Sequence, residues 1–288
     1  MSAEGASGLP LFLWCGCVSS HDLLSRAEAL HAGGYTATSA LCSDFAALEE
    51  QGWSPSRIAA ELRAREAHVT VIDPFLAWYP GWTNDTSDHA AALNATEDDV
   101  FRWADAVEAE SMSVLTPFSG TPAPMSQVVE ALGAFGDRAA THGLRLHLEV
   151  IPTSHAPDLA TGWSLIREVD RANVGLVLDT LHLGRGGCDP RMLDEIPLEK
   201  VFHIQLCDAP RTPRVEDYFE EVVTYRDFPG EGELGVDALV RHLIRDGTVP
   251  MCGPEVFSPD LRTLPVAEAG RLCAEKTRSF LAGLGLGA

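Results

Sequence analysis

The 288-residue sequence predicts an α/β fold, a single-domain (β/α)8 barrel over residues 1–288. Short β-rich apolar runs alternate with alanine-rich helical stretches, no linker or low-complexity region interrupts them, and eight such units fit into the chain. This alternation indicates βαβ units and a parallel sheet, and eight units of this size are typical of a closed barrel. An open doubly wound sheet is the alternative. It usually has a glycine-rich turn after its first strand, which Cys15-Gly16-Cys17 does not provide.

The eight strands are expected near Leu11–Cys17, Tyr35–Ser39, His68–Asp73, Ser113–Pro117, Leu144–Ile151, Gly175–Asp179, Val201–Cys207 and Pro250–Val256. The clearest helices are expected at His21–Ala32, Pro55–Ala64, Asp98–Ala109, Pro124–His142 and Val236–Asp246, with a closing helix and Gly-rich tail over Ala267–Ala288. We expect Ser19 or Ser20 to cap the first helix. Ser54 should cap the second, because Pro55 suits the first helical position.

Composition and charge restrict the function. The formal net charge is −21, which makes nucleic acid and anionic membrane surfaces poor partners. Seven cysteines at irregular spacing suggest free thiols in a reducing compartment. The longest apolar run, Leu9–Val18, is too short to cross a membrane and lacks the flanks of a signal peptide. We therefore expect a cytoplasmic protein that acts on a small molecule.

Each of the last four predicted strands ends in a carboxylate or amide side chain: Glu149, Asp179, Gln205 and Glu255. In a barrel of this kind, the carboxyl ends of the strands carry the active site. Three carboxylates converging in a partly buried cavity repel one another, and a divalent cation relieves that repulsion. One acidic residue at a strand end is often only a helix cap, but four consecutive strands favour a metal site. A ligand set that consists only of oxygen donors suits Mn²⁺ or Mg²⁺.

Strand periodicity separates the ligand candidates from two histidines. His147 shares a strand face with Glu149, and His203 shares one with Gln205. The later member of each pair lies nearer the barrel mouth, so the histidines are expected one layer deeper, as hydrogen-bonded core residues. If His203 were the ligand instead of Gln205, zinc or cobalt would also suit the site.

Several motifs together resemble the xylose-isomerase-like barrel superfamily of sugar isomerases, ketose epimerases, inosose dehydratases and dehydroshikimate dehydratases. The motifs are His147-Leu148-Glu149, Leu178-Asp179-Thr180-Leu181-His182, His203-Ile204-Gln205-Leu206-Cys207-Asp208-Ala209-Pro210, Pro229-Gly230-Glu231-Gly232-Glu233 and Pro254-Glu255. They cover the C-terminal half of the chain, whereas the first half matches only in its rhythm of strands and helices.

The resemblance implies one divalent metal held by Glu149, Asp179, Gln205 and Glu255. It further implies that His182 pairs with Asp179 as a substrate histidine, and that Arg211 points at a substrate oxygen. Ketose epimerases generally have histidine at the third ligand. Gln205 followed by Asp-Ala-Pro looks more like the dehydroshikimate dehydratase branch, which puts simple epimerase activity in doubt.

The expected chemistry is proton abstraction beside a carbonyl, followed by epimerisation, isomerisation or loss of water. Glu149 and Glu255 are expected to hold the metal and to move protons. His182 is the candidate for a separate acid or base, because imidazole titrates near neutral pH, although it could instead only orient Asp179.

Substrate contacts are expected from two loops. Trp78 and Trp82 belong to an aromatic segment after the third strand that could form a wall against a cyclic substrate, cover the barrel rim or contact another subunit. His155, in the loop after the fifth strand, is a further candidate. Arg226 could contact an anion, although an exposed salt bridge is the simpler expectation. The absence of clustered basic residues favours an unphosphorylated substrate.

Two other functional classes compete with the enzyme hypothesis. Endonuclease IV shares the superfamily, but DNA repair needs a cationic surface and more metal ligands than the strand ends offer. A non-catalytic barrel that binds a metal or a small ligand remains an alternative, although the intact ligand set argues against decay of the site. The sequence also allows a homo-oligomer.

Overall fold

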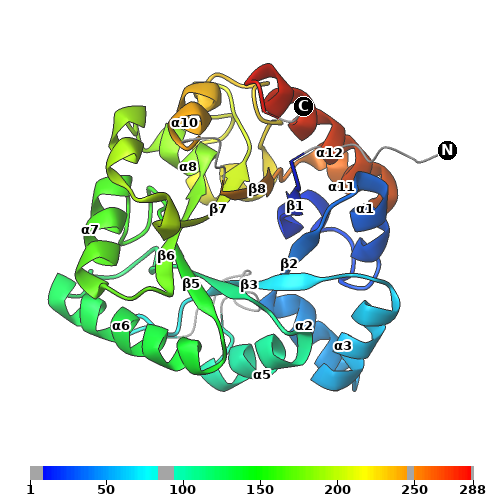
Figure 1. The fold of residues 1–288 in the computed structure, drawn as a ribbon, viewed down its shortest axis with the longest axis horizontal. Coiled ribbons are helices and arrows are strands. Elements are labelled where there is room, and N and C mark those ends of the chain that lie inside the picture. The colour runs from blue at the N-terminus through cyan, green and yellow to red at the C-terminus, as the bar shows by residue number, and fades with distance from the viewer. Residues whose placement is uncertain (1–8, 84–93, 245–249, 287–288) are drawn as a thin grey trace.

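The computed structural model describes residues 9–83, 94–244 and 250–286, and its eight parallel strands follow one another around one sheet in chain order. Figure 1 shows the strands ringed by the helices. This is the predicted single-domain (β/α)8 barrel. The strands are β1 (Phe12–Leu13), β2 (Ala37–Leu41), β3 (Val69–Phe75), β4 (Ser111–Val114), β5 (Arg145–Glu149), β6 (Val174–Asp179), β7 (Val201–Leu206) and β8 (Met251–Pro254).

The longer helices pack outside the sheet because each buries one apolar face against it. They are α1 (Arg26–Gly33), α2 (Cys42–Glu50), α3 (Pro55–Ala64), α5 (Glu97–Val107), α6 (Met125–Thr141), α7 (Leu159–Val169) and α12 (Val266–Gly283). Four shorter helices lie in the C-terminal half: α8 (Thr180–Arg185), α9 (Tyr218–Thr224), α10 (Val236–His242) and α11 (Pro259–Thr263). No helix in the described part of the chain is long and apolar enough to cross a membrane.

The barrel closes where β8 meets β1. The backbone N–H of Trp14 donates to the carbonyl of Pro254 over 3.3 Å. Gly253 lies so close to β1 that an added Cβ would be 1.6 Å from the carbonyl oxygen of Phe12. Only glycine allows the two backbones to approach to this distance, so Gly253 is a requirement of closure.

The start of the chain differs from the prediction. The first strand ends at Leu13, and residues Cys15–Val18 form a 3₁₀ helix instead of continuing it. The first helix begins at Arg26, after a turn in which the carboxylate of Asp22 accepts two backbone N–H groups, so Ser19 and Ser20 do not cap it. The predicted Ser54 cap is confirmed by its hydrogen bond from the N–H of Arg57.

The predicted deep histidines lie inside the barrel. The hydroxyl of Ser111 is 3.3 Å from His147 Nε2 and 3.5 Å from His203 Nε2, and the two imidazole rings are 5.0 Å apart. Burial lowers the pKa of His147 well below its usual value and lowers that of His203 to about 3. Both rings are therefore neutral core residues below the barrel mouth.

Candidate metal centre and active site

The four expected metal ligands converge at the carboxyl ends of neighbouring strands. Glu149 and Asp179 are the last residues of β5 and β6, Gln205 lies in β7, and Glu255 follows β8 directly. All four side chains are buried, with at most 7% of any residue exposed. The strand register places Asp179 beside Gln205, which brings donors from consecutive strands together. The strand-end pattern in the sequence therefore corresponds to one spatial cluster.

Glu149, Asp179 and His182 form the tightest group, with one potential ligand atom from each lying within 4.8 Å of the others. Nε2 of His182 is 3.2 Å from Oε1 of Glu149 and 3.7 Å from Oδ2 of Asp179. Asp179 also caps α8, because its Oδ1 accepts the N–H groups of Leu181 and His182. The cap uses one carboxylate oxygen and leaves the other turned toward the cluster.

Gln205 provides an independent sign that a ligand belongs here. Its Nε2 donates to Oε1 of Glu255 over 3.0 Å, whereas its buried Oε1 has no hydrogen-bond partner among the described residues. A buried amide oxygen without a partner costs free energy, and a cation would supply the missing interaction. The donor set of carboxylates, an amide oxygen and an imidazole fits a divalent metal.

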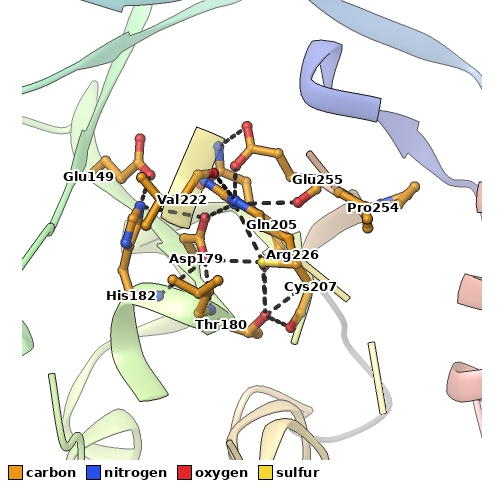
Figure 2. A network of polar contacts seen from close by, with 12 residues as sticks. Glu149, Asp179, Thr180, His182, Gln205, Cys207, Val222, Arg226, Pro254 and Glu255 are labelled. Atoms are coloured by element: carbon orange, nitrogen blue, oxygen red, sulfur yellow. Dashed lines mark hydrogen bonds and ion pairs between the residues drawn. The ribbon is translucent and has the colours of Figure 1, made fainter. Parts of the chain in front are cut away.

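Arg226 belongs to this cluster, although from the sequence it was expected only as a possible anion contact or an exposed salt bridge. The expectation of an exposed arginine is wrong, because Arg226 is 5% exposed and its Nη1 donates to Oδ2 of Asp179 at 2.6 Å and to Oε2 of Glu255 at 2.7 Å. Figure 2 shows its head group between these two carboxylates, with Glu149 and His182 beside them. Arg226 lies 20 positions after β7 in an irregular loop, where no strand or helix periodicity predicts its orientation.

Burial and these contacts set the ionisation of the cluster. Burial raises the pKa of Glu255 well above its usual range; Arg226 opposes that rise, and the neighbouring carboxylates reinforce it. Burial would also raise the pKa of Asp179, but the charges of Arg226 and His182 outweigh it and hold that pKa below its usual value. The carboxylates of the cluster, when ionised, therefore carry more negative charge than the single positive charge of Arg226 can neutralise.

A cavity of about 200 Å³ opens above the cluster, and Glu149, His182, Arg226 and Glu255 form part of its lining. Asp73, in β3, lines the same cavity from the opposite part of the barrel and was not among the site residues expected from the sequence. Burial, followed by the charge of Glu149, raises the pKa of Asp73 to about 7. The site thus combines buried acids, an imidazole and an arginine in one small cavity.

Sequence comparison identifies the family of this barrel. The family model for the xylose isomerase-like TIM barrel matches residues 27–277. The chain belongs to the xylose isomerase-like TIM barrel family. Members of this family use divalent metals, in agreement with the donor set at the strand ends.

Relatives of this chain whose functions are curated are enzymes. A 3-dehydroshikimate dehydratase from Pseudomonas aeruginosa is 31% identical over 147 residues, which cover 51% of this chain and 22% of that protein. An inosose isomerase from Bacillus subtilis is 28% identical over 145 residues, which cover 49% of this chain and 50% of that protein. The matched stretch therefore spans about a fifth of the first relative and half of the second.

Several solved structures share the fold of this chain. A structure described as IOLI protein with a binding zinc atom has a TM-score of 0.80 at 17% identity, covering 96% of this chain and 99% of that one. The probable 3-DHS dehydratase AsbF from Bacillus anthracis has a TM-score of 0.67 at 16% identity, covering 92% and 98%. At these identities the likeness concerns the fold.

The aromatic residues that line the cavity above the cluster are not Trp78 and Trp82, which were expected from the sequence. Phe118, Phe219 and Phe257 line it together with Tyr218. Trp78 is buried, donates its indole N–H to the carbonyl of Leu115 and is not among the cavity-lining residues. The segment after β3 therefore supports the barrel rim at this position.

The other expected substrate contacts lie outside this cavity. Trp82 and His155 line a neighbouring pocket of about 350 Å³, where Nδ1 of His155 is 3.0 Å from the hydroxyl of Tyr79. That pocket is larger, but none of the four metal-ligand candidates lines it. Arg211 is exposed and donates its backbone N–H to Glu233 over 2.9 Å. The buried ionisable groups face the smaller cavity, which makes it the candidate active site.

Proposed function

We propose that this protein is a divalent-metal-dependent enzyme that removes a proton beside the carbonyl of a small, cyclic polyhydroxy compound. Isomerisation, epimerisation or loss of water would follow. The observation that carries the proposal is the convergence of Glu149, Asp179 and His182 within 4.8 Å below a cavity of about 200 Å³. In a barrel, this end of the sheet is where catalytic groups collect.

Four residues would hold the metal: Glu149, Asp179, Gln205 and Glu255. A divalent cation at this position would polarise a substrate carbonyl and make the neighbouring C–H more acidic. The oxygen donors favour Mn²⁺ or Mg²⁺. Zinc is the alternative, because His182 adds an imidazole to the cluster and a zinc atom is named for the IOLI structure.

His182 is the proposed acid or base. Its Nδ1 is 2.6 Å from the hydroxyl of Tyr218, which fixes the plane of the ring, and its Nε2 faces Glu149 and the cavity. A positioned imidazole that exchanges a proton at one nitrogen while the other is held suits general acid–base catalysis. Glu149 and Glu255, which also line the cavity, are the carboxylates able to share that proton transfer.

The cavity favours a ring over an extended sugar. A dry cavity of about 150 Å³ is large enough to hold benzene, so about 200 Å³ accommodates one substituted six-membered ring. The aromatic side chains of Phe118, Phe219 and Phe257 offer flat apolar surface to one face of such a ring. The names of the relatives, 3-dehydroshikimate dehydratase and inosose isomerase, also point to cyclic substrates.

A dehydroshikimate-dehydratase-type lyase is the second candidate. Two observations favour it: glutamine at the third ligand position, which resembles that branch of the family, and 31% identity to the dehydratase from Pseudomonas aeruginosa. Abstraction of the proton beside the carbonyl is common to both candidates. They differ in whether a β-hydroxyl then leaves as water.

The test is hydrogen–deuterium exchange followed by NMR, in D₂O with Mn²⁺ or Mg²⁺. The panel comprises inososes, dehydroshikimate and linear ketoses. Glu149→Gln removes a carboxylate of the cluster. Asp44→Asn is the matched control, because Asp44 is a largely buried carboxylate that is paired with Arg26 and does not itself line the cavity.

We expect metal-dependent exchange or water loss on a cyclic compound with the wild-type protein and Asp44→Asn, and none with Glu149→Gln. Exchange confined to linear ketoses would contradict the cyclic preference. Tight metal binding without exchange on any compound would contradict the enzyme hypothesis and favour a barrel that only binds its ligand.

A further inference from the structure

The side chain of Arg226 is anchored along its length before it reaches the site. Its backbone N–H donates to the carbonyl of Phe257 over 2.8 Å, and its Nε donates to the carbonyl of Val222, in α9, over 2.5 Å. The guanidinium carbon lies 5.0 Å from the centre of the Phe257 ring. The direction of the guanidinium is therefore set by three contacts that do not involve the carboxylates.

From this anchored position, one nitrogen joins ligand candidates on two strands that are not neighbours. Nη1 contacts Asp179 at the end of β6 and Glu255 just after β8, while β7 runs between those strands. The same nitrogen lies 3.3 Å from the backbone carbonyl of Glu255 and 3.4 Å from the sulfur of Cys207, so it sits close to the strand ends themselves. No backbone ladder connects β6 directly to β8, and Arg226 supplies that connection.

The charges of the cluster match this arrangement. Glu149, Asp179 and Glu255 together carry three negative charges when ionised, and Arg226 reduces the sum to minus two. One divalent cation then makes the group neutral. The other oxygen of each bridged carboxylate is held as well: Oδ1 of Asp179 accepts backbone N–H groups of α8, and Oε1 of Glu255 accepts from Gln205.

We propose that Arg226 is a positioning residue of the metal centre that holds Asp179 and Glu255 at the spacing a divalent cation needs. The inference rests on the proposed function only in requiring that the site binds a metal. Residues that orient metal ligands typically contribute about 10–100-fold to metal affinity. The effect of Arg226 should therefore be visible in metal binding itself, without any substrate.

The experiment measures Mn²⁺ affinity by titration calorimetry and by electron paramagnetic resonance of free Mn²⁺, in metal-stripped protein. Arg226→Met removes the bridge and the charge. Arg226→Lys keeps the charge but loses the Nε–H that anchors the side chain to the carbonyl of Val222. Arg26→Met is the matched control, because Arg26 is equally buried and paired with Asp44 but lies outside the cavity lining. Circular dichroism establishes which variants are folded.

We expect Mn²⁺ affinity to fall about 100-fold in Arg226→Met and about tenfold in Arg226→Lys, and to stay unchanged in Arg26→Met. Removal of a positive charge would, by charge alone, tighten the binding of a cation. A gain in affinity in Arg226→Met would therefore overturn the proposal.

If Arg226→Met does not fold, Arg226→Lys still tests the proposal. An Mn²⁺ affinity equal to that of the wild type in Arg226→Lys would also overturn the positioning role. Failure of the wild-type protein to bind Mn²⁺, Mg²⁺ or Zn²⁺ would instead contradict the proposed function. The two failures are therefore distinguishable.

Discussion

His182 is held between two partners, and its Nδ1 lies 2.6 Å from the hydroxyl of Tyr218. The opposite nitrogen, Nε2, lies 3.2 Å from a carboxylate oxygen of Glu149. A carboxylate oxygen can accept from Nε2 and the hydroxyl of Tyr218 can donate to Nδ1, so the neutral tautomer that suits both contacts has its proton on Nε2. The arrangement places a transferable proton at the nitrogen that faces the cavity.

Replacing His182 by alanine should lower turnover about 10²–10⁴-fold, because an acid or base that acts in the transition state contributes this much. Tyr218→Phe should have a smaller effect, since the imidazole remains and only its orientation is released. Both variants are measured by steady-state kinetics on the substrate found in the exchange experiment. A near-normal rate in His182→Ala would leave this residue a structural role only.

Asp73 should make the metal-free protein less stable as the pH rises. Burial and Glu149 raise its folded-state pKa to about 7, whereas an unfolded aspartate has a pKa of about 3.9. The unfolded chain therefore releases this proton first, and stability falls between about pH 4 and pH 7 and stays lowered above that. The other ionisable groups lining this cavity are Glu149, Glu255, His182, Tyr218, Arg226 and the thiol of Cys15, which lies beside Asp73.

Asp73→Asn has no charge to bury, so its free energy of unfolding should exceed that of the wild type by a few kcal/mol at pH 8. At pH 4 the two proteins should be nearly equal, because Asp73 is then protonated in the folded state of the wild type. Urea titrations in the presence of a chelator measure both values. A stability difference that does not change with pH would exclude ionisation of Asp73 as its cause.

The parts of the site that follow from strand order were predictable from the sequence, and those that depend on loops were not. Glu149, Asp179 and Glu255 end apolar strands, and parallel strands bring such ends to one edge, so their convergence follows from local pattern and topology. Arg226 reaches the same place from a loop, and only the folded path of that loop makes it buried. Trp78 was expected at the substrate and is instead buried, because an aromatic residue near a strand end can equally fill the space under the barrel rim.

The thiols of this protein should be nearly unreactive while it is folded. Six of the seven cysteines are buried, and Cys188 is partly exposed. Burial, followed by the charge of Asp189, raises the pKa of Cys188 to about 11, so roughly a thousandth of it is thiolate at pH 8. Burial also raises the pKa of Cys252 to about 12.

Reaction with a chromogenic disulfide at pH 8 should therefore modify Cys188 slowly and first. The remaining thiols should appear only when a denaturant is added. Cys188→Ser identifies the early phase by removing it. Rapid modification of several thiols in the native protein would mean that the barrel opens locally far more often than this packing implies.

Closure of the barrel at β8 should be destabilised when Gly253 gains a side chain. The new methyl group would lie 1.6 Å from the carbonyl oxygen of Phe12, and a backbone atom of β1 cannot move aside without disturbing its pairing. Gly253→Ala should therefore cost about 3 kcal/mol or more, a drop in Tm of roughly 6–10 °C for a chain of this length.

Gly283→Ala is the control for this substitution, because an added Cβ there has no heavy atom within 4 Å. Gly283 is the last residue of α12, where alanine is a better helix former than glycine, so the control should keep or slightly raise the Tm. Differential scanning calorimetry compares the two variants. An equal Tm in both would show that β8 can shift away from β1 without loss, and that the close approach at Gly253 does not hold the barrel shut.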